Sequence, residues 1–406
     1  SHEEKYDDAN EDYHYTGCDI CDSVLDYEAH SYGSDDCTEC GYVITPALSH
    51  THVQNLTRVP SNEQSCTEEG NIEYYICSCE KWFTDSTATT EIEDKTSVII
   101  AKDMEEVCPD AWFLNYTNPM AMITGYMLRY TKIKTVGLCH SVQGCSKDLL
   151  NALGMEDKVE GRTDVIAGIN HMAWLLDVRD KDGNDLYPEI KKRAKEKNAT
   201  EKHGDMVRYD YIDKLGYYCT ESSEHNAEYN GFYIKSRYPE MIEEFNIPLD
   251  EYPRRCVNQI AGWEEERDRI LADGKITHER SKEYASYIME AIVTNKPYKI
   301  GGNVLNNGLI DNLPKEACVE VPCLVDGSGI TPCHMGELPL QLAAMNASNI
   351  YPQLLTIKAA ATLEKKYIYN AAMMDPLTGT ELNIKDIYAM VDEMLEAHKD
   401  WLPEYH

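Results

Sequence analysis

The feature that most constrains the fold is a short apolar run that stops at a polar turn and continues as a helix, found twice in succession. Residues 111–116 have the character of a buried strand and are followed by Asn118-Pro119 and an apolar helix over 120–130. Asn as the cap and Pro as the first helical residue are a strong helix-start signal. A strand over 133–138 and a helix that runs to Gly154 repeat the pattern. This alternation predicts an α/β fold with an open, mostly parallel sheet.

Polar side chains stand where the predicted strands end. Asn118 follows the first strand, Cys139 and His140 follow the second, and His171 follows a third over 164–169. Ligands of open α/β sheets bind beyond the carboxyl ends of the strands. A thiolate and an imidazole there can hold a divalent metal and leave positions open for a substrate. Each residue alone could be a helix cap, a buried thiol or a core histidine, but their shared placement favours a site.

A second polar cluster occupies residues 217–229, where a solvated helix face would explain most of the composition. Its carboxylates, histidine and tyrosines also make it a source of a general base, with Glu224, His225 and Tyr229 as candidates. Farther along, Arg255 precedes an amphipathic helix and could clamp a polar substrate.

The first hundred residues differ from the rest, because they hold seven of the fifteen cysteines. Two Cys-x-x-Cys pairs separated by fifteen residues match the spacing of a zinc ribbon, which we expect over residues 1–46 with one structural Zn²⁺. Disulfides or an unfilled segment are the alternatives. The four predicted zinc ligands are Cys18, Cys21, Cys37 and Cys40.

Residues 47–100 contain short β-prone stretches separated by polar turns, which predicts a small β-rich cysteine module. A further metal site there is a less favoured alternative to incidental thiols, and it would use His50, His52, Cys66, Cys77 and Cys79. We expect the remaining chain to divide into half of a nucleotide-binding domain (101–180) and a substrate and oligomerisation domain (181–406).

Charge and hydropathy exclude several classes of function. The net charge of −33 argues against a nucleic-acid or anionic-membrane partner. No run of about 18 apolar residues exists, so no transmembrane helix is expected. The acidic start is unlike a secretory signal, which predicts a cytoplasmic location.

Several motifs resemble glycoside hydrolase family 4, and its α-galactosidase members most of all. The resemblance covers about residues 101–406. The motifs lie at 108–122, which contains Asn-Tyr-Thr-Asn-Pro-Met, at 137–144 with Cys-His-Ser, and at 167–174, 303–308 and 338–346.

The resemblance implies a glycosidase that uses NAD⁺ and Mn²⁺ and cleaves α-galactosides by oxidation, elimination, addition and reduction, outside the usual two-carboxylate mechanism. It also implies an α-galactoside as the small-molecule partner, and we expect a homo-oligomer. By matching position, the implied roles are metal ligands for Cys139 and His171, a proton donor for His140, substrate binding for Asn118 and Arg255, and a base among Glu224, His225 and Tyr229.

One departure from the family pattern is serious. Members begin with a strand and a Gly-rich turn for the NAD pyrophosphate, whereas no G-x-G-x-x-G occurs here. The only G-x-G is Gly327-Ser328-Gly329, with Pro332 in place of the third glycine. We therefore expect an incomplete Rossmann-like sheet and an inactive isolated chain. The alternatives are a zinc-ribbon binding or structural protein with a hydrolase remnant, or a NAD-dependent dehydrogenase.

Overall fold

The computed structural model describes residues 103–273 and 283–406 together with six strands in the first hundred residues. The chain forms two units, Ser1–Asp103 and Met104–His406. Within the described ranges, no helix is both long enough and apolar enough to cross a membrane.

The first unit contains two three-stranded antiparallel sheets. Their strands are β1 (Glu4–Ala9), β2 (Tyr13–Cys18), β3 (Val24–Ala29), β4 (Leu56–Val59), β5 (Tyr74–Cys77) and β6 (Trp82–Phe83). Of the predicted metal ligands, Cys18 and Cys77 end strands β2 and β5. The others lie outside the described residues: Cys21, Cys37, Cys40, His50, His52, Cys66 and Cys79.

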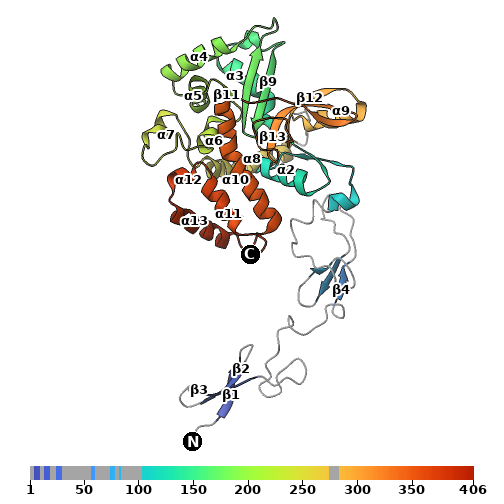
Figure 1. Ribbon diagram of the computed structural model, residues 1–406, viewed down its shortest axis with the longest axis vertical. Coiled ribbons are helices and arrows are strands. Elements are labelled where there is room, and N and C mark those ends of the chain that lie inside the picture. Colours follow the sequence, from blue (N-terminus) through green and yellow to red (C-terminus); the bar gives the residue numbers. More distant parts are fainter. Residues whose placement is uncertain are drawn as a thin grey trace. The chain divides into compact units, whose positions relative to one another are not determined.

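The second unit is built on an eight-stranded sheet of order β11-β10-β9-β13-β12-β8-β7, with β14 paired to β13 (Figure 1). Its strands are β7 (Trp112–Asn115), β8 (Lys134–Gly137), β9 (Thr163–Ile169), β10 (Met172–Arg179), β11 (Tyr218–Cys219), β12 (Tyr298–Leu305), β13 (Cys318–Asp326) and β14 (Gly329–Pro332). Strands β7 to β10 precede residue 180, where a domain boundary was expected, and strands β11 to β14 follow it. All eight belong to one sheet.

The sheet is mixed, whereas the sequence pattern predicted a mostly parallel one. Only β7 and β8 pair in parallel, and the other pairings in this sheet are antiparallel. The physical reason is clear at β9 and β10, because a connection of only two residues, Asn170 and His171, can join antiparallel strands but not parallel ones. The predicted α/β class with a partial Rossmann-like arrangement is confirmed.

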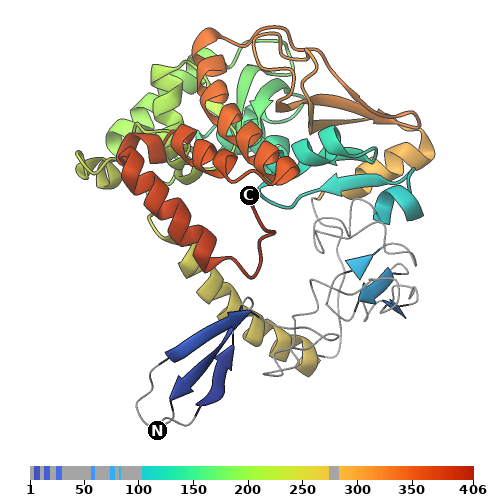
Figure 2. The ribbon, with the colours of Figure 1, turned by 60° about the horizontal axis from the view of Figure 1, so that its bottom comes forward.

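Helices cover both faces of this sheet. They are α2 (Met120–Tyr130), α3 (His140–Ala152), α4 (Tyr187–Thr200), α5 (Met206–Lys214), α6 (Ser223–Glu228), α7 (Glu240–Glu244), α8 (Glu251–Asp273), α9 (Ala285–Thr294), α10 (Leu340–Thr362), α11 (Lys366–Met374), α12 (Thr378–Glu381) and α13 (Ile384–Ala397). Helix α2 packs against α10 and the sheet, and α11 packs against α10 and α13. Figure 2 shows α8 extending away from the other helices of its unit.

The hairpin formed by β9 and β10 lies in the core and holds its turn in a fixed position. Trp174 and Ala173 on β10 are fully buried. Gly168 on β9 has a φ of 156°, and a Cβ there would lie 2.6 Å from the carbonyl oxygen of Met172. Glycine is therefore required at position 168, and the tight approach fixes the turn that carries His171.

Candidate functional site

Three side chains with metal-binding atoms meet at one edge of the sheet. The Cys139 sulfur, a ring nitrogen of His171 and a carboxylate oxygen of Glu221 all lie within 4.8 Å of one another. Cys139 follows β8, His171 lies in the β9–β10 turn, and Glu221 lies between β11 and α6. The structure thus brings together the two residues that the sequence placed at strand ends. It adds Glu221, a carboxylate of the 217–229 cluster that was not predicted to be a metal ligand.

His171 is held from both edges of its ring. Its Nδ1 lies 2.9 Å from the Tyr229 hydroxyl, and its Nε2 lies 3.5 Å from Oε2 of Glu221. The backbone φ of His171 is 62°, a region that side-chain-bearing residues rarely adopt. Burial lowers the pKa of His171 although Glu221 opposes the shift, so a neutral imidazole with a free lone pair is favoured.

Cys139 is buried, and its thiol is neutral without a cation beside it. Burial raises the pKa of Cys139 to about 12, and the nearby Glu320 adds to the shift, while a 3.0 Å contact between Sγ and the Ser141 hydroxyl opposes it. The backbone N–H of Cys139 donates to the Tyr284 hydroxyl at 2.7 Å, which fixes the strand end. A bound divalent cation is what would deprotonate such a thiol.

The donor set fits a divalent metal. It offers sulfur, nitrogen and oxygen from three separate segments, and three protein ligands leave coordination positions for water or substrate. Tyr229 supplies the outer hydrogen bond that ligating histidines usually make. Glu221 could have been found from sequence as a further strand-end residue, but β11 is only two residues long and gives almost no strand signal.

His140 begins α3 beside Cys139 and belongs to a second small cluster. Its Nε2 bonds the Glu283 carboxylate, and its ring stacks on Tyr116 with the centroids 5.0 Å apart. Burial, and then the charge of Glu283, raise the pKa of Tyr116 to about 12. Neither Tyr116 nor Glu283 was predicted from the sequence to contact His140. Glu283 is 143 positions from His140 along the chain.

Asn118 is exposed and ends the loop after β7. Its Oδ1 accepts the backbone N–H of Met120 at 3.2 Å. The prediction of Asn118 as the cap and Pro119 as the first helical residue is wrong by one position, because Pro119 has an extended ψ of 100° and is itself the cap residue before α2. The Asn118–Pro119 peptide bond is cis. The hydrogen bond from Met120 engages the amide oxygen, so the amide nitrogen is the atom with which Asn118 could reach a substrate.

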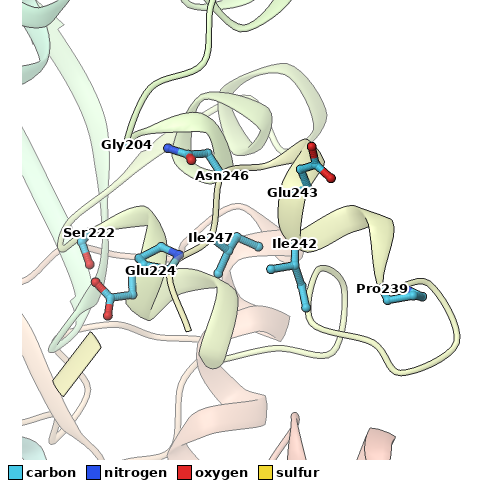
Figure 3. A pocket seen from close by; sticks show the side chains of 9 residues that line it. Gly204, Ser222, Glu224, Pro239, Ile242, Glu243, Asn246 and Ile247 are labelled. Carbon is cyan, nitrogen blue, oxygen red and sulfur yellow. The ribbon is translucent and has the colours of Figure 1, made fainter. Parts of the chain in front are cut away.

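The three base candidates lie in different surroundings. Tyr229 contacts His171 directly, and burial raises its pKa. The His225 ring lies 5.8 Å from the His171 ring, and its Nδ1 is 3.5 Å from Oε2 of Glu228. Glu224 lines a cavity of about 550 Å³, with Ile242 and Glu243 of α7 on the opposite side (Figure 3). Glu224, His225 and Glu228 form a second group whose ligand atoms lie within 4.8 Å of one another.

Arg255 is exposed on α8 and is not a member of either cluster. Its neighbour Arg254 pairs with Glu251 at 2.9 Å on the same helix. A substrate-binding role for Arg255 stays a prediction.

The described residues do not fit the pyrophosphate of NAD. The turns after the two parallel strands are residues 116–119 and 138–139, and neither contains glycine. The nearest glycine, Gly137, is packed rather than open, because a Cβ there would lie 2.3 Å from the Met120 sulfur and 2.9 Å from Cβ of Asn303. A dinucleotide cradle needs backbone that can approach phosphate closely.

Comparison with known sequences identifies the family. The model described as family 4 glycosyl hydrolase matches residues 95–155, and that of its C-terminal domain matches residues 166–378. An α-galactosidase of Bacillus subtilis (strain 168) is 66% identical over 307 residues, which are 75% of this chain and 70% of that protein. An α-galactosidase of Rhizobium meliloti (strain 1021) is 37% identical over 314 residues, 75% of this chain and 63% of that protein.

Solved structures share the fold. A 6-phospho-α-glucosidase from gut microorganisms in complex with NAD and Mn²⁺ has a TM-score of 0.58 at 21% identity, over 75% of this chain and 70% of that one. A 6-phospho-β-glucosidase from Thermotoga maritima with manganese, NAD⁺ and glucose-6-phosphate has a TM-score of 0.54 at 20% identity, over 72% and 66%. The family models, the Bacillus relative and the shared fold agree with one another, and this chain belongs to glycosyl hydrolase family 4.

Proposed function

We propose that this chain is the metal- and substrate-binding part of an NAD-dependent α-galactosidase. The observation that carries the proposal is the convergence of Cys139, His171 and Glu221 at one edge of the sheet. The relative that is 66% identical is an α-galactosidase, which supports the substrate class. Family membership favours this function over the dehydrogenase alternative.

Cys139, His171 and Glu221 would hold the metal, which we propose to be Mn²⁺ as in the related structures named above. When bound, such an ion polarises sugar hydroxyl or carbonyl oxygens as a Lewis acid. Asn118, at the neighbouring strand end, would orient the sugar through its amide nitrogen.

Tyr229 is the base candidate that the geometry supports best, because it is the one that hydrogen-bonds a ligand of the proposed metal. Removal of the C2 proton of the sugar would require the phenolate, and a cation beside His171 supplies the positive charge that favours this form. Glu224 lines its own cavity, and His225 faces Glu228, so both are weaker candidates.

His140 would deliver a proton to the departing oxygen. Glu283 holds Nε2 and Tyr116 holds the ring face, so Nδ1 is the nitrogen left to meet a substrate. No hydride step is assigned to the described residues, because they do not fit the NAD pyrophosphate.

The test uses an aryl α-galactoside with Mn²⁺, NAD⁺ and a reductant, in heavy water. The isolated chain should leave the substrate uncleaved. A hybrid with a family-type nucleotide-binding half in place of residues 1–100 should release galactose with deuterium at C2. An aryl β-galactoside is the matched substrate control. Cleavage by the hybrid that survives Cys139→Ala, or galactose without deuterium, would contradict the proposal.

Further parts of the proposal concern the first unit and the assembly. We propose one structural Zn²⁺ on Cys18, Cys21, Cys37 and Cys40, a homo-oligomeric state and a cytoplasmic location. Elemental analysis should find about one zinc per chain, lost in a quadruple Cys→Ser variant, and light scattering should give a mass above 46.2 kDa. Zinc retained in that variant or a monomeric mass would contradict the respective part.

A further inference from the structure

We propose that Asn346 and Asn349 of α10 are positioning residues for the proposed metal site, because they hold the two backbone segments that carry His171 and Tyr229. The proposal rests on the function proposed above and adds two residues to its site. Both asparagines act through His171 and Tyr229 and not on the substrate itself.

Asn346 holds the turn that carries His171. Its Nδ2 donates to the carbonyl oxygen of Met172, the residue after His171, at 2.7 Å. A Cβ at Gly168 would lie 3.2 Å from Oδ1 of Asn346, so the glycine leaves room for this amide. The β9–β10 turn is therefore tied to α10 at the position next to the histidine.

Asn349 holds the backbone of Tyr229. Its Nδ2 donates to the carbonyl oxygen of Tyr229 at 3.1 Å, and Tyr229 is the cap residue at the end of α6. Carbonyl groups at a helix end have no partner within the helix, so this side chain supplies one. Residues three positions apart lie on the same face of a helix. One face of α10 thus reaches both residues of the His171–Tyr229 contact.

Packing of α10 does not explain why residue 346 is an asparagine. Asn346 is fully buried, and its Oδ1 has no hydrogen-bond partner among the residues that the structure describes. Burial of an unpaired amide oxygen is unfavourable, and asparagine is a poorer helix former than leucine. The carbonyl that its nitrogen holds gives the side chain a purpose.

The contact between His171 and Tyr229 needs such support. It joins residues 58 positions apart, and His171 has a φ of 62° that the surrounding structure must maintain. Helix α10 has 23 residues and bonds to both segments, so it fixes their separation. A rigid element positions a site more accurately than loops do.

The first experiment is a double-mutant cycle in the full chain, with the Mn²⁺ affinity measured by electron paramagnetic resonance. Asn349→Leu should lower the affinity about threefold or more. In the Tyr229→Phe background the same substitution should have no further effect, because the contact that Asn349 positions is already lost. Losses that multiply in the double variant, or an unchanged affinity in Asn349→Leu, would overturn the proposal.

Asn306→Leu is the matched control for a purely structural effect. Asn306 is also fully buried, and its Nδ2 donates to the carbonyl oxygens of Ile310, Leu313 and Pro314. The antiparallel register of β12 on β8 places it away from the strand end that carries Cys139. Asn306→Leu should lower the free energy of unfolding and keep the Mn²⁺ affinity of the parent. An affinity loss equal to that of Asn349→Leu would count against a positioning role.

A measurement without metal separates this proposal from the proposed function. In the chain labelled with ¹⁵N-histidine, the ring resonances of His171 are assigned by their absence in His171→Gln. They should shift in Asn346→Ser and in Asn349→Leu and stay unchanged in Asn306→Leu. If Asn346→Ser does not fold, Asn349→Leu decides, since Asn349 is only partly buried.

Unshifted His171 resonances in Asn349→Leu would overturn the positioning role. Shifted resonances in a protein whose parent binds no Mn²⁺ would support the positioning role and contradict the proposed function.

Discussion

The Tyr229 hydroxyl lies 2.9 Å from Nδ1 of His171, while the other ring nitrogen, Nε2, faces Glu221 at 3.5 Å. If His171 holds a metal through Nε2, the proton of the imidazole would be on Nδ1 and would be donated to the Tyr229 oxygen. In that arrangement the contact would fix the tautomer of His171 and the direction of the metal-binding lone pair.

Replacing Tyr229 by Phe removes this contact and keeps the ring. We expect the Mn²⁺ affinity to fall about ten- to a hundredfold, as is usual when an outer hydrogen bond to a ligating histidine is lost. Electron paramagnetic resonance of free Mn²⁺ gives the affinity directly. Tyr130→Phe, on an exposed tyrosine at the end of α2, is the control and should bind as the parent does. Equal affinities for all three proteins would show that Tyr229 does not hold the ligand.

Cys139→Ser tests the thiolate as a ligand. Losing a direct ligand should cost more than losing an outer contact, so the Mn²⁺ affinity should fall on the order of a hundredfold or more. Cadmium, which prefers sulfur, should lose affinity by a larger factor than manganese does. Cys333→Ser changes an exposed free cysteine and serves as the control. Unchanged cadmium binding in Cys139→Ser would remove Cys139 from the ligand set.

Glu221→Gln tests which of the two groups of metal-binding side chains holds Mn²⁺, the one with Cys139 and His171 or the one with His225. If Glu221 is the third ligand, this substitution should lower the Mn²⁺ affinity at least about tenfold. Glu224→Gln alters the neighbouring group that contains Glu224, His225 and Glu228 and should leave this affinity unchanged. The opposite order of effects would place the metal in the second group.

Strand and helix signals in the sequence located much of the scaffold correctly. The predicted helix over 120–130 is α2, with the bounds Met120–Tyr130. The sequence also shows apolar residues at helical spacing from Ile384 to Leu395 with Asn383 before them, and Asn383 caps α13 by accepting the backbone N–H groups of Lys385 and Asp386. These features are local, because a cap and an apolar run depend on residues a few positions apart.

The features that sequence reasoning missed depend on long-range packing. Strand β11 comprises only Tyr218 and Cys219, and its pairing with β10 is what brings Glu221 to Cys139 and His171. The bond between His140 and Glu283 joins residues 143 positions apart. Such contacts leave no periodic signal, because the fold creates them.

Glu320 gives the chain a dependence of stability on pH. This carboxyl is fully buried on β13, where it accepts a hydrogen bond from Nδ2 of Asn303 at 2.8 Å. Burial raises the pKa of Glu320 from 4.5 to about 8, although the bond from Asn303 opposes the shift.

The raised pKa fixes the sign of the effect. Between about pH 4.5 and pH 8 the folded chain keeps the proton of Glu320 that the unfolded chain has lost. The free energy of unfolding should therefore decrease as the pH rises through this window, by an amount on the order of a few kcal/mol for this one group.

Glu320→Gln should remove that dependence, because glutamine is neutral at every pH in the window and keeps an oxygen acceptor for Asn303. Urea unfolding at pH 5.5 and pH 8 should show a smaller loss of stability in Glu320→Gln than in the parent. Glu196→Gln, on the exposed surface of α4, is the control and should keep the parent's pH dependence. A pH dependence in Glu320→Gln equal to that of the parent would show that another group titrates with folding.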